Sequence, residues 1–297
     1  MEIYLKRKPD AGGTYFDISR NVNGRIGRYE INQRVDGGGN GVVHVCTDEL
    51  SGYEYAVKFQ LQLSDQRRQR FNRELELFQH ADHNHLIRFV DAGVTAGKSC
   101  SVEPVDSKLV RKTNGEVQIP FVVMELASNN LKNALKQSKP QREDYLGQFR
   151  GLSEGLGVLH DHALHRDIKP SNILVIGDRW VISDYGLCSF LNDHQAPLTL
   201  DGERTAPIDW MSPEQENKRL LIGGELTAAS DVYQLAMIFW FVVTGERIEG
   251  QPNPQDWNGP PGLLKPILKA LSINPLERQT NGKSFAEELG DAIFSNG

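Results

Sequence analysis

The chain has 297 residues, of which 39% are hydrophobic and 24% charged, and this composition excludes a disordered or a fibrous protein. Its formal net charge of −6 argues against a surface that coats nucleic acid, because such a surface needs a basic excess. A chain of this length can fold as one large domain or as two lobes, and we expect two lobes.

The sequence predicts neither a secretion signal nor a membrane span. The charges of residues 1–8 are followed by no long apolar stretch, and the longest apolar run, residues 235–243, is about half of what a bilayer requires. We therefore expect a soluble, cytoplasmic protein with neither membrane nor nucleic acid among its partners. Cys46, Cys100 and Cys188 lie far apart without a CxxC spacing, which predicts free thiols.

The N-terminal part of the chain is predicted to form strands joined by turns. Residues 1–28 alternate between apolar and polar types around Pro9–Gly13, which indicates an extra hairpin or a strand pair laid against the main body. The glycine-rich turn 36–41 lets backbone amides approach an anion, although a plain hairpin turn would have the same composition. Strands are predicted around this turn and after it, over 29–35, 42–46 and 53–59.

A lysine interrupts the half-buried pattern of the third of these strands. Lys58 would be an exposed edge residue unless an acidic partner lies near it, and the helix predicted over 65–79 offers Glu74 and Glu76. We favour Glu74, because it lies one turn before Phe78 on the side of the helix that must face the core.

The chain beyond this helix is polar and rich in turns. A strand is expected over 83–90 and another over 121–126, and the stretch 93–116 between them is a long loop or a hairpin. The histidines near residue 83 lack a carboxylate or cysteine that would complete a metal site. From residue 128 onward, apolar residues recur every three or four positions, which predicts two helices.

The stretch His165–Asn172 carries the strongest chemical signal. Asp167 and Asn172 flank Lys169 on a loop that leads into the apolar strand 173–176, so that a base, a cation and a metal ligand meet at one point. Such a set is suited to phosphoryl transfer. The interpretation depends on matching parts elsewhere in the chain.

The C-terminal part is predicted to be mainly helical. After a short strand and the triplet Asp184–Gly186, a very apolar helix is expected over 227–244. This helix contains one acid, Asp231, which should be paired because the helix belongs in a core. Closing helices are predicted over 263–271 and 284–293.

Taken together, these stretches resemble the protein kinase family, and the resemblance covers residues 29–291. It implies an α+β bilobal fold, with a small antiparallel β-sheet and one main helix in an N-lobe of about 29–127 and a larger, mainly helical C-lobe of about 128–291. Residues 1–28 would be an extension and 292–297 a tail. Lys169 and the proline after it look like the serine/threonine branch of the family.

The resemblance implies roles in phosphate transfer for matching residues. Asp167 would orient the attacking hydroxyl and accept its proton, and Lys169 would steady the moving phosphate. Asn172 and Asp184 would hold Mg²⁺ through oxygen ligands. The implied activity is that of a serine/threonine protein kinase, which transfers the γ-phosphate of ATP to Ser or Thr hydroxyls of a protein substrate.

Further matching residues would bind ATP. Lys58, held by Glu74, would contact the α and β phosphates, and the glycine-rich turn would cover them. Apolar residues would enclose the adenine, Met124 would sit at the gate of the pocket, and the backbone that follows would bond the purine edge. In chain order, the implied ATP-binding residues are Gly38, Gly41, Val43, Ala56, Lys58, Glu74, Met124, Glu125, Ala127, Leu174 and Asp184.

The resemblance also implies a structural framework. Asp231 would tie the base of an apolar column between the lobes, and Glu214 would pair with Arg278 deep in the C-lobe. The residues expected to stack in the column are His165, Tyr185, Phe78 and Phe89.

Three positions depart from the family pattern. Asp36 stands where the first glycine of the turn is expected, and its carboxylate would repel phosphates unless it points away. Tyr185 replaces the usual Phe and adds a hydroxyl that needs a partner. Pro207 falls where the family has Thr, which affects peptide docking more than ATP chemistry, and Thr205 would take that place through a small insertion.

Phosphorylation of the segment after Asp184 is a further expectation. Arg166 matches the residue that receives an activation-loop phosphate in the family, and Glu203 would imitate such a phosphate. The candidate autophosphorylation sites are Ser189, Thr199 and Thr205.

Two alternatives stand beside an active kinase. A nucleotide-binding pseudokinase or signalling scaffold would keep the motifs without transferring phosphate, and Asp36 and the irregular segment before Trp210 favour it. A small-molecule phosphotransferase of kinase-like fold would lack Lys169 and Ser212–Glu214, which are both present.

Overall fold

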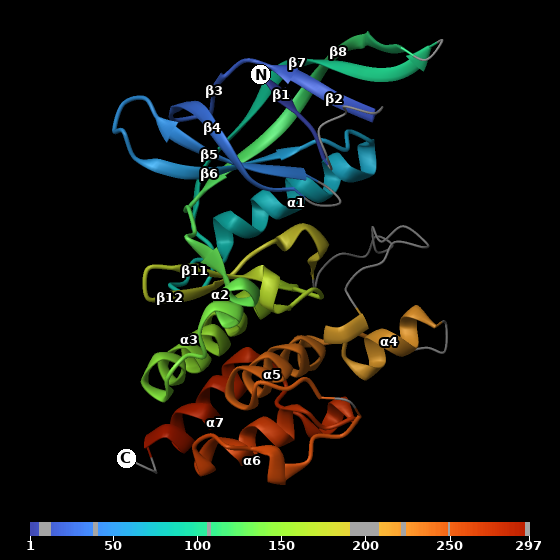
Figure 1. Cartoon of the computed structure of the whole chain (residues 1–297). Helices are drawn as coiled ribbons and strands as arrows, with labels where there is room; N and C mark the ends of the chain where they lie inside the picture. The colour runs from blue at the N-terminus through green and yellow to red at the C-terminus, as the bar shows by residue number, and fades with distance from the viewer. Residues whose placement is uncertain are drawn as a thin grey trace. The chain divides into compact units, whose positions relative to one another are not determined.

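The computed structural model describes residues 1–5, 13–37, 41–105, 108–190, 208–220, 224–248 and 250–294 (Figure 1). Contacts between residues divide the chain into two units, Met1–Glu76 with Arg88–Leu126, and Leu77–Ile87 with Ala127–Gly297. Three predicted site residues, Gly38, Thr199 and Thr205, lie outside the described residues, and so does the side chain of Asp36.

The first unit is built on an antiparallel sheet of eight strands within the described ranges, in the order β1-β2-β7-β8-β6-β5-β4-β3. Helix α1 (Asp65–His80) follows β6 in the chain. The strands are β1 (Glu2–Ile3), β2 (Gly13–Ile18), β3 (Asn21–Asn23), β4 (Arg28–Gly37), β5 (Gly41–Asp48), β6 (Glu54–Gln60), β7 (Phe89–Val105) and β8 (Lys108–Met124).

Residues 1–28 form part of this sheet. β1 pairs with β2, and β2 pairs with β7 over six residue pairs. Figure 1 shows β1, β2 and β7 in one sheet. β3 extends the opposite edge by pairing with β4. The strand pair predicted for this segment is therefore confirmed. β7 and β8 form a long hairpin, which was one of the two predictions for residues 93–116.

Alternating side chains on β6 and β8 build the core of the first unit. Val57 and Phe59 on β6, and Ile119, Phe121 and Val123 on β8, are fully buried in one apolar cluster. Alternate residues of a strand point to opposite faces of a sheet. The residues between these, among them the predicted site residues of β6, therefore belong to the other face.

The second unit is mainly helical, so that the predicted α+β class is confirmed. Its helices are α2 (Leu131–Gln137), α3 (Arg142–His160), α4 (Pro213–Arg219), α5 (Ala228–Thr244), α6 (Pro261–Ala270) and α7 (Gly282–Phe294). Its short strands are β9 (Asn129–Asn130), β10 (Ala163–Leu164), β11 (Ile173–Ile176), β12 (Arg179–Ile182) and β13 (Ser189–Phe190).

Stacked aromatic rings join three of these helices. Phe149 of α3 stacks on Phe239 of α5 with 3.9 Å between ring centroids, and Phe239 stacks on Phe285 of α7 at 5.8 Å. Helix α5 is buried along nearly its whole length, as its apolar composition predicts, and a capping box of Thr227 and Ser230 begins it. This buried helix is the platform for the polar loop described below.

The strand predicted over 83–90 is wrong for most of its length. β7 begins only at Phe89, and the residues before it bond to β12 instead of entering the sheet. The N–H of Ile182 donates to the His85 carbonyl at 2.8 Å, and the N–H of Ile87 donates to the Ile182 carbonyl at 2.9 Å. Apolar residues such as Leu86 and Ile87 suit a strand that pairs along a sheet and an extended segment with only two such hydrogen bonds equally well, so composition does not distinguish the two.

Two further sequence-based expectations concern the cysteines and a membrane-spanning helix. Cys46, Cys100 and Cys188 are free thiols, as predicted. No helix within the described ranges has both the length and the apolar character that crossing a bilayer requires.

Candidate active-site residues

In the first unit, the sheet presents a lysine beside an acid. Lys58 lies on β6 and Glu74 on α1, and the Lys58 Nζ donates to Glu74 Oε1 at 2.7 Å. The side chains of Lys58 and Glu74 are 14% and 4% exposed, so that solvent screens this pair little. Glu76 is exposed. The acid that the sequence favoured is therefore the one that pairs with Lys58.

β4 and β5 flank the glycine-rich turn, and both ends of the turn are described. Gly41 begins β5, opposite Gln60 of β6. A Cβ on Gly41 would lie 2.5 Å from the Phe59 carbonyl oxygen, so that only glycine permits this approach of the two strands. Val43 follows on β5 and is half-buried.

The register of β6 and β8 positions the other site residues of the first unit. Ala56 pairs with Met124, and both are buried. Glu125 ends this segment, where its N–H donates to the Arg88 carbonyl at 3.1 Å and its Oε1 accepts the Arg88 N–H at 2.9 Å. These two bonds fix the backbone that follows Met124.

In the second unit, Asp231 holds the loop that follows β10. Its carboxylate accepts the backbone N–H of His165 at 2.7 Å and that of Arg166 at 2.8 Å, and lies 3.1 Å from His160 Nε2. Burial alone would raise the pKa of Asp231, but the hydrogen bonds and charges that it receives, first those of His160, hold this pKa below its ordinary value. The lone acid of α5 is thus paired, as predicted.

His165 connects this loop to the end of β12. Its Nδ1 accepts the Asp167 N–H at 3.3 Å and its Nε2 donates to the Ser183 carbonyl at 3.1 Å. Burial lowers the pKa of His165, and a neutral imidazole with one donor and one acceptor matches both contacts.

Three residues of the predicted apolar column lie in the second unit. The His165 and Tyr185 rings meet edge to face with centroids 6.0 Å apart, and the Phe78 ring lies 5.0 Å from that of Tyr185. Phe89, the fourth, belongs to the first unit.

Asp167, Lys169 and Asn172 form one hydrogen-bonded cluster. Lys169 Nζ donates to both carboxylate oxygens of Asp167, at 2.9 and 2.7 Å. Asn172 Nδ2 donates to Asp167 Oδ2 at 3.0 Å and to the Asp167 carbonyl at 2.9 Å. The amide oxygen of Asn172 is then the atom of that side chain suited to a cation.

Burial raises the pKa of Asp167 to about 6. The charge and hydrogen bonds of Lys169 and the hydrogen bond from Asn172 oppose this rise, whereas the negative charge of Asp184 adds to it. A carboxylate with such a pKa is ionised at neutral pH and remains basic enough to accept a proton.

Asp184 follows β12 in a left-handed backbone conformation with φ 66° and ψ 70°, and its side chain is exposed. Arg166, with φ 69°, is the other non-glycine residue with positive φ among the described residues. Such strained residues gather at functional sites. Two carboxylates whose charges interact, together with the Asn172 amide oxygen, suit a hard cation such as Mg²⁺, which prefers oxygen ligands.

A metal site of another kind is not found in the described part of the chain. No group of three His, Cys, Asp or Glu side chains there could hold a metal ion. Mg²⁺ commonly binds through one or two protein oxygens plus the phosphates of a substrate, and the Asn172 and Asp184 pair fits that mode.

The remaining predicted site residues described in the second unit are Ala127, Leu174 and Ser189. Leu174 of β11 pairs with Val181 of β12 and is half-buried, as is Ala127. β13 pairs with β10, which sets Ser189 opposite Leu164, one residue before His165.

The predicted salt bridge between Glu214 and Arg278 is confirmed. Arg278 Nη1 and Nη2 donate to the two carboxylate oxygens of Glu214 at 2.7 and 2.9 Å, and both residues are buried. Burial acts to raise the pKa of Glu214, but the hydrogen bonds from Arg278 and Ser230 bring this pKa below its ordinary value.

Sequence reasoning missed a second polar support of the loop. The N–H of Ile168 donates to Gln234 Oε1 at 3.3 Å, and Gln215 Nε2 donates to the Arg166 carbonyl at 2.7 Å. Gln234 also donates to Gln215 at 3.1 Å. The sequence contains a signal for the role of Gln234, because this residue lies three positions after Asp231, on the same face of an apolar helix.

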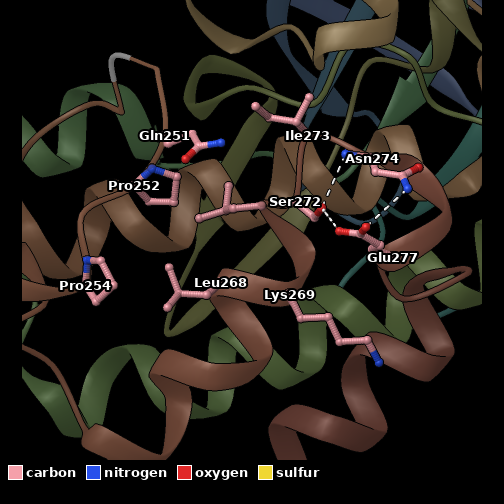
Figure 2. A pocket seen from close by; sticks show the side chains of 10 residues that line it. Gln251, Pro252, Pro254, Leu268, Lys269, Ser272, Ile273, Asn274 and Glu277 are labelled. Atoms are coloured by element: carbon pink, nitrogen blue, oxygen red, sulfur yellow. Dashed lines mark hydrogen bonds between the residues drawn. The ribbon is translucent and has the colours of Figure 1, made fainter.

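A groove of about 670 Å³ in the second unit is separate from these residues (Figure 2). It lies between the loop with Pro252 and Pro254 and the end of α6 near Leu268. Figure 2 shows that Ser272 and Glu277 bond to each other at its rim. None of the predicted site residues lines this groove.

Comparison with known proteins adds independent information. The sequence profile of the family described as "Protein kinase domain" matches residues 29–260. The chain is 26% identical over 291 residues to the probable serine/threonine-protein kinase PknB of Corynebacterium glutamicum, which covers 89% of this chain and 42% of that protein. It is also 26% identical over 284 residues to the serine/threonine-protein kinase PknA of Mycobacterium tuberculosis, covering 89% and 61%.

A third relative is the serine/threonine-protein kinase AfsK of Streptomyces coelicolor, 26% identical over 288 residues, covering 92% of this chain and 33% of that protein. The chain therefore spans between about a third and three fifths of the length of these relatives.

Proposed function

The chain belongs to the protein kinase family, and from that premise we propose that it transfers the γ-phosphate of ATP to Ser or Thr hydroxyls of a protein substrate. The observation that carries this proposal is the hydrogen-bonded cluster of Asp167, Lys169 and Asn172 on a loop held by Asp231. The kinase domain would comprise residues 29–291, with lobes of about 29–127 and 128–291.

Asp167 would act on the attacking hydroxyl. Its ionised carboxylate would orient the hydroxyl and accept its proton as the oxygen bonds to the γ-phosphorus and the bond from that phosphorus to the bridging oxygen breaks, which releases ADP. Its raised pKa favours acceptance of the proton. Lys169 would exchange one of its two bonds to Asp167 for a bond to the transferred phosphate, and so offset the charge of that phosphate.

Mg²⁺ would neutralise charge on the phosphates of ATP, and Asn172 and Asp184 would hold it through oxygen atoms. The exposed side chain of Asp184 is accessible for this purpose. Asn172 is already oriented, because its Nδ2 is fixed on Asp167.

Residues at the family's ATP-binding positions would bind ATP. The Glu74 carboxylate holds the Lys58 ammonium, which would contact the α and β phosphates, and the turn with Gly38 and Gly41 would cover them. By the family's use of the matching positions, Val43, Ala56 and Leu174 would enclose the adenine. Met124 would sit at the gate of the pocket, and the backbone of residues 125–127 would bond the purine edge.

The test is transfer of label from γ-labelled ATP in the presence of Mg²⁺, with the purified chain alone and with a generic basic protein. Label recovered on Ser or Thr supports the proposal, and mass spectrometry would show whether Ser189, Thr199 or Thr205 carries it. Measurable ATP binding without any label would contradict the proposal and identify a nucleotide-binding pseudokinase.

A further inference from the structure

β4 departs twice from a regular ladder just before the glycine-rich turn. Its successive pairs with β5 are Ile31↔Cys46, Arg34↔His44 and Asp36↔Val43. β4 therefore has one extra residue in each of the two intervals. Such bulges disrupt the ladder locally and bend the strand. The end of β4 consequently needs support from outside the β4–β5 pair.

Arg34, between the two bulges, receives this support from the start of the chain. Its Nη1 donates to the Tyr4 carbonyl and its Nη2 to the Leu5 carbonyl, both at 2.8 Å. Its guanidinium carbon lies 4.8 Å from the centroid of the Tyr4 ring. A planar guanidinium can make two hydrogen bonds and an aromatic contact at once, whereas a lysine ammonium cannot reproduce this geometry.

The segment that Arg34 holds is itself anchored in the sheet. Ile3 is fully buried in the apolar cluster of the first unit, Leu5 packs against that cluster, and β1 pairs with β2. The contacts of Arg34 therefore connect the bulged end of β4 to a fixed part of the unit.

Two further side chains, one on β5 and one on β4, support the same bulges. His44, which is buried, has its Nδ1 3.1 Å from the Asn32 carbonyl oxygen, and Asn32 Nδ2 donates to Thr47 Oγ1 at 2.8 Å. Arg34 is thus one of three side chains whose hydrogen bonds hold the bulged part of β4 in place.

We propose that Arg34 is a positioning residue for the glycine-rich turn, and that residues 1–5 thereby contribute to nucleotide affinity. This inference rests on the proposed function, since the ligand of the turn is taken to be the triphosphate of ATP. Loss of the Arg34 contacts frees the end of β4, which leads into the turn, so that ordering β4 on nucleotide binding costs more affinity. The cluster around Asp167 belongs to the other unit, so that affinity falls while the chemical step is preserved.

The test compares Arg34→Gln with Arg28→Gln. Arg28 lies on the same strand, its exposed side chain pairs with Glu49, and it makes none of the contacts to residues 4 and 5. In Arg34→Gln, we expect MgATP to bind about five-fold more weakly, which is the loss of roughly one net hydrogen bond. KM for ATP should rise by the same factor with kcat nearly unchanged, and amides of 31–37 and 41–48 should exchange hydrogen faster. Arg28→Gln should change none of these.

Equal ATP affinity and equal exchange in the two variants would overturn the inference. If Arg34→Gln fails to fold, the same measurements on Arg34→Lys test the inference, because this variant keeps the charge and loses the paired hydrogen bonds.

ATP binding and hydrogen exchange need no phosphate transfer. They therefore test the inference even where the wild type binds ATP and transfers no phosphate. A wild type that binds no ATP would overturn the proposed function and the inference about affinity together, whereas unchanged exchange beside normal ATP binding overturns the inference alone.

Discussion

The carboxylate of Asp231, on the buried helix α5, accepts the backbone N–H of His165 at 2.7 Å. The same carboxylate accepts the next N–H, that of Arg166, so one acid fixes the backbone that leads into Asp167. An Asn at position 231 has nearly the same shape, but it lacks the charge and turns one oxygen into a donor that faces other donors.

Asp231→Asn should therefore lower both stability and activity. We expect the free energy of unfolding to fall by about 2–3 kcal/mol, because buried N–H groups lose a charged acceptor. Denaturant unfolding and phosphate transfer measure the two effects. Asp178→Asn, on an exposed side chain, is the matched control and should leave both unchanged. A variant at position 231 with wild-type stability would contradict this role.

The two glutamates of α1 allow a direct test of the pair with Lys58. Glu74→Gln should lower kcat/KM for ATP about 10- to 100-fold, since the charged hydrogen bond at 2.7 Å is lost. Glu76→Gln makes the same chemical change two residues later, on an exposed side chain. Its kcat/KM for ATP should stay within about two-fold of the wild-type value. Equal losses in steady-state assays of the two variants would refute the assignment of Glu74.

The raised pKa of Asp167 predicts a stability effect with a defined sign. The folded state holds the proton of Asp167 more tightly than the unfolded state, so the stability gained by protonation is present at low pH and is lost as the pH rises through about 6. At pH 7.5 the buried, ionised carboxylate of Asp167 destabilises the folded state. Asp167→Asn should therefore raise the free energy of unfolding by about 1–3 kcal/mol. Lys169 loses its partner in this variant, which reduces the gain.

Unfolding curves of wild type and Asp167→Asn between pH 4 and pH 8 measure this effect. The difference between the two proteins should shrink as the pH falls below about 6. Transfer activity of the wild type should fall over the same range, because a protonated carboxyl cannot accept the hydroxyl proton. A pH-independent stability difference would contradict the raised pKa.

The salt bridge between Glu214 and Arg278 should matter far more than an exposed one. Arg278→Gln leaves the buried Glu214 carboxylate without its cation and should cost about 3–5 kcal/mol. Arg150→Gln removes the exposed pair with Glu154 on α3 and should cost less than about 1 kcal/mol. Chemical denaturation compares them, and similar losses would show that burial does not dominate this pair.

The sequence alone predicted most of the helices, because helices depend on local patterns. The roles of the candidate site residues came from the family resemblance and stay predictions. Helical periodicity identified the face of α1 that carries Glu74, and the lone acid in an apolar helix identified Asp231 as paired. The partner of Glu214 came only from the family resemblance, since 64 residues separate it from Arg278.

Features that depend on distant backbone pairing were not predictable. The segment before Phe89 has the composition of a strand, but its hydrogen bonds go to β12, and no local signal marks that choice. The bulges on either side of Arg34 depend on the register between β4 and β5, and the residues that hold Arg34 precede it by 30 and 29 positions. The contact of Asn32 with Thr47, across the same two strands, likewise depends on this pairing.

The measurement that tests the account most directly is phosphate transfer by wild type and Asp167→Asn, with MgATP affinity determined for both. The account predicts label on Ser or Thr with the wild type, and a loss of at least about 100-fold in Asp167→Asn at similar ATP affinity, because the variant keeps the ATP-binding residues and lacks the base. Equal transfer by the two proteins would contradict the account, since Asp167 would then have no part in the reaction.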